Sequence, residues 1–145
     1  MLEIYEFFIG SKPSFLRSFE GEGQEALYQQ ATIFWNKLDS AAFWLPFIVL
    51  VVGGGLAYLY YGPINNKPGR RYHPKWWYGM MVACAVVSFF LSFILPMWLV
   101  GTSFNGSLGL EIKLAFGNMC YAIVFYFIVS FVWCKWGKTN AYRYL

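Results

Sequence analysis

The side chains that commonly bind metals are few in this sequence and lie far apart. His73 is the only histidine, and the three cysteines (Cys84, Cys120 and Cys134) lie inside or at the end of apolar runs without a CxxC spacing. A zinc site needs several such ligands, and a haem held by two histidines cannot form from one. We therefore expect buried cysteines outside any disulfide framework, and neither a metal nor another cofactor.

Catalytic motifs are also missing from the sequence. It contains no GxSxG, no HExxH and no glycine-rich phosphate loop after a strand, and no paired aspartates lie in its apolar runs. An enzyme needs an acid, a base or a nucleophile brought together in one place. The sequence thus predicts a protein without catalytic activity.

Three uncharged apolar runs are each long enough to cross a bilayer. They cover residues 41–61, 76–100 and about 114–134, and a helix of ~20 residues at ~1.5 Å per residue covers the ~30 Å hydrocarbon layer. Only 12% of the residues are charged, about half the share in a soluble domain. We predict an all-α integral membrane protein with three transmembrane helices, the transmembrane domain being residues 41–145.

The region before these runs, residues 1–40, is more polar. Within it, residues 24–38 place apolar side chains on one helical stripe, with glutamine and lysine opposite: Leu27, Ala31, Phe34, Trp35 and Leu38. We expect an amphipathic helix that lies on the outer membrane surface or against the bundle. Glycines at 21 and 23 predict a turn before it, and residues 1–9 could form a short helix that cannot span.

Charge predicts which side each segment faces. The loop 62–75 and the tail 135–145 carry bases and no acid, whereas residues 1–40 carry six acids against three bases and the connection 101–110 is neutral up to Leu110. By the positive-inside rule the N-terminus lies outside and the C-terminus in the cytoplasm, in the inner (plasma) membrane of the cell. Aromatic residues are expected as two interfacial belts: Tyr58, Tyr60, Tyr61, Trp76, Trp77, Tyr78, Trp133 and Trp136 inside, and Trp35, Trp44, Trp98 and Phe104 outside.

Small or kink-forming residues recur every four positions in the second run: Cys84, Ser88, Ser92 and Pro96. Such a stripe lets another helix approach closely in lipid, so it predicts packing within the chain. A subunit contact or a pore lining is the alternative. Pro96 should bend the helix, with the Ser92 hydroxyl near the freed backbone groups.

Three consecutive glycines, Gly53, Gly54 and Gly55, lie in the middle of the first run. We expect a close helix crossing there, extended by Ala57, with local unwinding around a ligand or ion as the alternative. The spans hold no charged residue, which argues against ion coupling. Glu111 and Lys113 are expected at the outer mouth of the third span as interfacial caps.

The basic loop between the first two runs contains the residues we expect to dock lipid or a partner protein: Lys67, Arg70, Arg71, His73 and Lys75. Each base near anionic lipid contributes ~1 kcal/mol. The prolines of the loop would fix its shape, which a purely electrostatic tether does not need.

Together these features predict a non-catalytic multi-pass subunit of a larger membrane assembly, such as secretion or transport machinery. It would be anchored there through the cytoplasmic loop or the outer N-terminal region. The alternative is a homo-oligomeric channel or membrane-disrupting effector lined by the second span. Expected partners are membrane lipid and other membrane-protein subunits or copies of this chain; no basic face suits a nucleic acid, and no small-molecule substrate is indicated.

Overall fold

The computed structural model describes residues 1–21, 23–64, 74–101 and 107–137, and within these ranges all regular structure is helical. The all-α prediction is thus confirmed for the described part of the chain. Three helical stretches are long and apolar enough to cross a membrane: Glu25–Ile64, Pro74–Val100 and Ser107–Trp136. Each contains one of the three predicted apolar runs.

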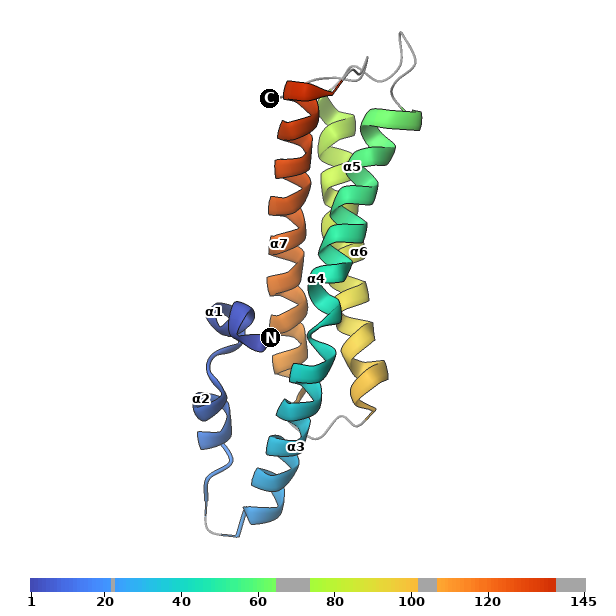
Figure 1. Cartoon of the computed structure of the whole chain (residues 1–145). Coiled ribbons are helices and arrows are strands. Elements are labelled where there is room, and N and C mark those ends of the chain that lie inside the picture. Colours follow the sequence, from blue (N-terminus) through green and yellow to red (C-terminus); the bar gives the residue numbers. More distant parts are fainter. Residues whose placement is uncertain (22, 65–73, 102–106, 138–145) are drawn as a thin grey trace.

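The first stretch is a rod of five successive segments (Figure 1): α3 (Glu25–Ala41), α4 (Trp44–Ile48), the π-helical η2 (Val49–Gly54), α5 (Gly55–Leu59) and η3 (Tyr60–Ile64). A straight helix of 40 residues at ~1.5 Å each would extend ~60 Å, about twice the hydrocarbon thickness; here the backbone leaves helical geometry at Gly62, near the end of the stretch. The amphipathic helix α3 therefore continues the direction of the first span. Of the two placements expected for α3, packing against the bundle is the one observed.

The other two long helices, α6 (Pro74–Val100) and α7 (Ser107–Trp136), pack antiparallel along most of their length (Figure 1). We call the end where α6 finishes and α7 starts the hairpin end. The expectation that the connection reaches Leu110 is wrong, because α7 begins at Ser107. The reason is packing: Leu110 and Leu114 are buried in a cluster with Leu38 and Val100, so the helix continues beyond the third apolar run.

Residues 1–9 fold as a short helical piece, η1 (Leu2–Tyr5) followed by α1 (Glu6–Ile9), which we call the N-terminal arm. The arm lies against α7, and α2 (Lys12–Arg17) then runs beside α3 (Figure 1). The short helix expected over residues 1–9 is confirmed, whereas α2 was not predicted. Leu2, Tyr5 and Ile9 join the buried cluster at the hairpin end.

A second buried cluster fills the opposite half of the bundle, where α5, η3, α6 and α7 meet. Outside the two clusters, the long helices expose many large apolar side chains. No more than a third of the most apolar window of each helix is buried within the chain. The outer surface of the bundle is therefore apolar and its polar groups lie inside.

Candidate functional site

The small-residue stripe of α6 lies in the contact with α7. Cys84, Ser88, Ser92 and Pro96 are all buried, while neighbours on the opposite side of the helix, such as Val86 and Phe90, are exposed. The backbone of α6 stays helical through Pro96. In this arrangement the stripe is a packing surface, and no described residue of it faces the outside of the bundle.

Asn118 of α7 connects this stripe to the N-terminal arm. Its amide nitrogen donates to Ser92 Oγ at 2.5 Å, and its amide oxygen accepts the Tyr5 hydroxyl at 2.6 Å. Ser92 Oγ thus accepts the Asn118 amide, and its expected role beside Pro96 stays a prediction. Burial, and then the neighbouring Tyr121, raise the pKa of the Tyr5 hydroxyl well above its usual range, so Tyr5 keeps its donor proton.

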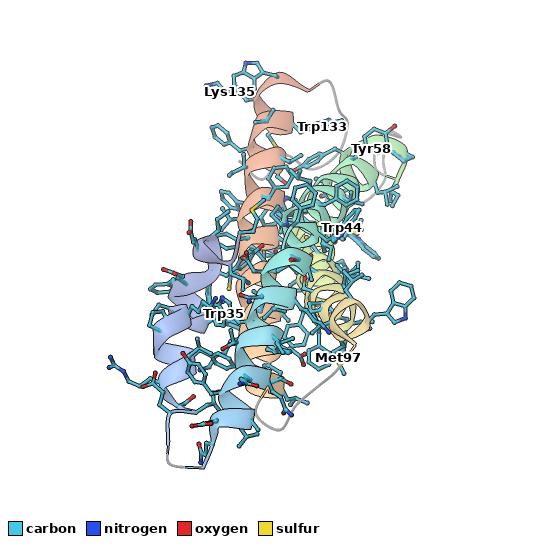
Figure 2. All side chains as sticks on the ribbon, turned by 60° about the horizontal axis from the view of Figure 1, so that its bottom comes forward. Trp35, Trp44, Tyr58, Met97, Trp133 and Lys135 are labelled. Atoms are coloured by element: carbon cyan, nitrogen blue, oxygen red, sulfur yellow. The ribbon has the colours of Figure 1, made fainter. Side chains whose placement is uncertain are left out.

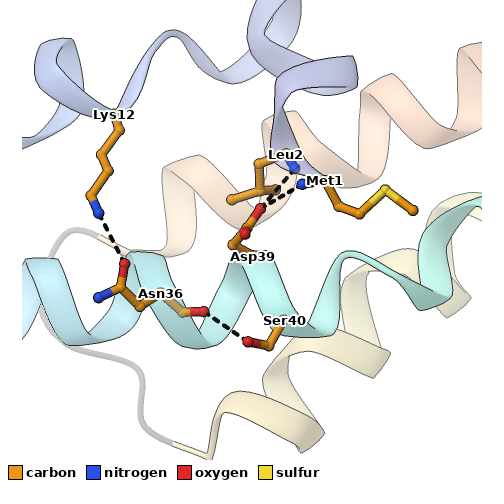
Figure 3. A network of polar contacts seen from close by, with 6 residues as sticks. All are labelled: Met1, Leu2, Lys12, Asn36, Asp39 and Ser40. Atoms are coloured by element: carbon orange, nitrogen blue, oxygen red, sulfur yellow. Dashed lines mark hydrogen bonds and ion pairs between the residues drawn. The ribbon is translucent and has the colours of Figure 1, made fainter.

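Two further contacts fix the arm on α7. The Tyr121 hydroxyl donates to the Ile4 carbonyl at 2.6 Å, and the Phe8 ring lies so close to Gly117 that an added Cβ there would stand 2.8 Å from it. At the arm's start, Asp39 of α3 accepts the Leu2 N–H at 2.9 Å and pairs with the Met1 ammonium at 3.0 Å (Figure 3). The arm therefore bridges α3 and α7.

The far half of the α6–α7 contact carries weaker polar contacts and an aromatic cluster. Trp77 Nε1 donates to Ser130 Oγ at 3.3 Å, and Cys84 Sγ donates to the Ala122 carbonyl at 3.7 Å. Figure 2 shows Tyr58, Trp133 and Lys135 at this end of the bundle, where Trp133 packs against the rings of Tyr58 and Tyr61. These ring contacts pack the end of the first span against α7.

This packing corrects the prediction of two interfacial belts. Phe104 lies outside the described residues, and four of the other eleven aromatics assigned to the belts are buried inside the protein: Trp35, Tyr60, Tyr61 and Trp77. Trp35 lies between α3 and the N-terminal segments (Figure 2), and Phe15 packs on its ring. Sequence position alone cannot separate a ring that packs in the core from one that faces a headgroup.

The three glycines of the first span differ in surroundings. A Cβ at Gly53 would lie 3.0 Å from the Phe125 ring and 3.3 Å from the Ala122 carbonyl of α7, whereas Gly54 has ordinary space and Gly55 has nothing within 4 Å. Gly53 and Gly54 end the π-helical η2, a wider turn that keeps its backbone bonded, and Gly55 begins α5. Gly53 thus lies at a close crossing with α7, and Ala57 is buried one turn later.

Three buried polar groups among the described residues lack a hydrogen-bond partner: Ser88 Oγ, Ser107 Oγ and Glu111 Oε2. Glu111 was expected as an interfacial cap, yet its side chain is only 2% exposed. It points inward because α7 is helical and packed from Ser107 onward. Lys113, two residues along, is exposed, as the helical geometry requires.

Four of the five residues predicted to dock lipid or a partner, Lys67, Arg70, Arg71 and His73, lie outside the described residues. The fifth, Lys75, is exposed in the first turn of α6. Within the described ranges no three His, Cys, Asp or Glu side chains gather as a metal site would require.

The described polar contacts join the arm, α6 and α7 to one another. The sequence identified the α6 stripe, but not the pairing of Asn118 with Tyr5 and Ser92. The missing information is the arm's position on α7, since Tyr5 and Asn118 lie 113 residues apart in the chain. The sequence offers two indications of such a contact: Tyr5 lies in a short apolar helix, and Asn118 is a strongly polar residue within the third span.

Comparison with known proteins finds no family model, no curated protein and no solved structure that matches this chain.

Proposed function

We propose that this protein crosses the membrane three times, with its N-terminus outside and its C-terminus in the cytoplasm, as a non-catalytic subunit of a larger membrane assembly such as secretion or transport machinery. One observation carries the proposal: the spans turn their polar side chains inward to one another and their large apolar side chains outward. The outer surface is therefore where this protein can interact.

Two features favour an assembly over an inert anchor. The hairpin of α2 and α3 projects beyond the bundle (Figure 1) and is held to it by the arm, so it offers a folded surface outside the spans. Large aromatic side chains are exposed on the arm and near the end of α6, with Phe7 91% and Trp98 82% exposed. Aromatic residues are enriched in the buried centres of protein interfaces.

A homo-oligomeric channel or membrane-disrupting effector is the second candidate. Its path would run along Ser88 and Ser92, and both side chains are buried against α7. Opening such a path would separate α6 from α7 and break the Asn118–Ser92 bond. We therefore rank this function below the subunit.

Photo-crosslinking in native membranes tests the proposal. A benzophenone amino acid placed at Phe7 or at Trp98 should give one discrete product that joins the 16.8 kDa chain to a different membrane protein. The same amino acid at Tyr126, which is buried, should give no intermolecular product. Products only at multiples of the chain's own mass would contradict the subunit function.

Liposomes that contain the purified protein separate the two candidates further. The subunit proposal predicts no ion leak. A leak abolished by Ser88→Leu and Ser92→Leu, with membrane insertion intact, would establish the channel instead.

A further inference from the structure

A pocket of about 340 Å³ lies at the hairpin end, at the junction of α3 and α4. It is lined by Lys37, Ser40, Ala41, Trp44 and Leu99. We propose that this pocket binds the phosphate-bearing headgroup of an anionic membrane phospholipid. The proposal goes beyond the proposed function. It requires only that the protein crosses the membrane three times, and it holds for any protein partner and for either orientation of the hairpin end.

The pocket is built by one face of the rod and the last turn of α6. Lys37, Ser40, Ala41 and Trp44 follow the three-and-four spacing that aligns side chains on one side of a helix. That side faces α6, where Leu99 completes the wall. The polar members stand at one end of the pocket and the apolar members at the other, because Lys37 and Ser40 precede Trp44 along the rod.

The pocket lies at the level where the apolar part of the bundle ends. Asp39 is the last charged residue before the uncharged run of the first span, and Leu99 is next to last in α6. Trp98, beside Leu99, is 82% exposed. Exposed tryptophans mark the headgroup level of a bilayer, so the lysine stands at the water side and the indole and leucine reach the hydrocarbon.

Lys37 gives the pocket its positive charge. It is the one charged residue in the lining, and the single ion pair among the described residues joins Met1 to Asp39. Asp39 follows Lys37 by two positions, about 200° around the helix, and is directed at the arm (Figure 3). The lining of the pocket therefore contains no acidic side chain that could neutralise Lys37.

The lining chemistry fits a phospholipid better than a free anion. The ammonium of Lys37 and the indole N–H of Trp44 are donors for phosphate oxygens, and the Ser40 hydroxyl, which now donates to the Asn36 carbonyl at 3.1 Å, can rotate to become a third. Inorganic phosphate would leave Ala41, Trp44 and Leu99 uncovered. The glycerol and first acyl carbons of a lipid would cover them.

Native mass spectrometry of the full-length, detergent-purified protein tests this site. We expect phosphatidylglycerol to bind several-fold more than diacylglycerol, which has the same chains without the phosphate. Lys37→Gln should reduce phosphatidylglycerol binding at least threefold, and Lys37→Arg should retain it. Lys113→Gln is the matched control, because Lys113 is an exposed lysine near the same end but outside the pocket.

Three results would overturn the proposal. An equal loss in Lys37→Gln and Lys113→Gln would mean diffuse charge attraction. Competition by inorganic phosphate at concentrations equal to the lipid's would mean a free-anion site. Lys37→Gln could also leave lipid binding unchanged and lower the melting temperature of the lipid-free protein. That result would mean that Lys37 donates hydrogen bonds to the backbone carbonyls at the end of α6.

Discussion

At Asn118, three parts of the chain share one buried side chain. The amide gives its N–H to Ser92 of α6 and its oxygen to Tyr5 of the arm, so both hydroxyls depend on it. In a bilayer such bonds average ~0.6 kcal/mol each and reach ~1.7. A residue that makes two of them is where a single substitution should have most effect.

Asn118→Leu should destabilise the protein by about 1–2 kcal/mol, because it leaves the Tyr5 and Ser92 hydroxyls without a partner inside the bundle. Thermal unfolding in detergent measures the loss. Tyr5→Phe removes only one of the two bonds and should lower the midpoint about half as far. A midpoint of Asn118→Leu equal to that of the unmodified protein would show that the network contributes no stability.

The glycine triplet allows a matched comparison. Gly53→Ala should cost about 1–3 kcal/mol, since its Cβ would press on the Phe125 ring and on the Ala122 carbonyl. Gly55→Ala meets nothing within 4 Å and should be neutral or stabilising, because alanine favours a helix by up to ~1 kcal/mol. Denaturation midpoints of the two variants give the answer. Equal effects would mean that α7 does not approach at Gly53.

At the scale of elements, the arm is a short piece whose position depends on its contacts with Asp39 of α3 and with α7. Gly117→Val should displace it, because even a Cβ at Gly117 would stand 2.8 Å from the Phe8 ring. A cysteine placed at Leu2, which is buried, in a background without the native cysteines would then react with a maleimide. Gly109→Val is the control, because Gly109 is at an open position of α7, the helix that also contains Gly117. It should leave the cysteine at position 2 protected from the maleimide.

The elements also show where sequence reasoning succeeds and where it stops. Uncharged runs of this length identify the long helices because lipid leaves the backbone no other partner. The start of α7 and the burial of Glu111 depend on packing against α6 and on the buried cluster at the hairpin end, which no local pattern encodes. The same holds for Trp35 and Trp77. Tryptophan is typical of the membrane–water interface, but packing against neighbouring helices buries these two side chains in the core.

At the scale of the whole molecule, polar side chains are buried between the helices and large apolar side chains are exposed. The buried contacts include Asn118, Ser92 and Ser130, while large apolar side chains cover the outer faces of the long helices. In water this surface would be unstable, and in a bilayer it is matched to its surroundings. In the proposed topology, the single crossing made by α6 places Lys75, at the start of α6, and Lys113, near the start of α7, on opposite sides of the membrane.

Cysteine labelling in intact cells tests this central claim most directly. Cysteines replace Lys113 or Lys75, both exposed, in a chain whose native cysteines have been removed, and a membrane-impermeant maleimide is added. We predict labelling of the cysteine at 113 in intact cells and of the cysteine at 75 only after permeabilisation. Labelling of both, or of 75 alone, in intact cells would contradict the three-crossing topology with an outside N-terminus.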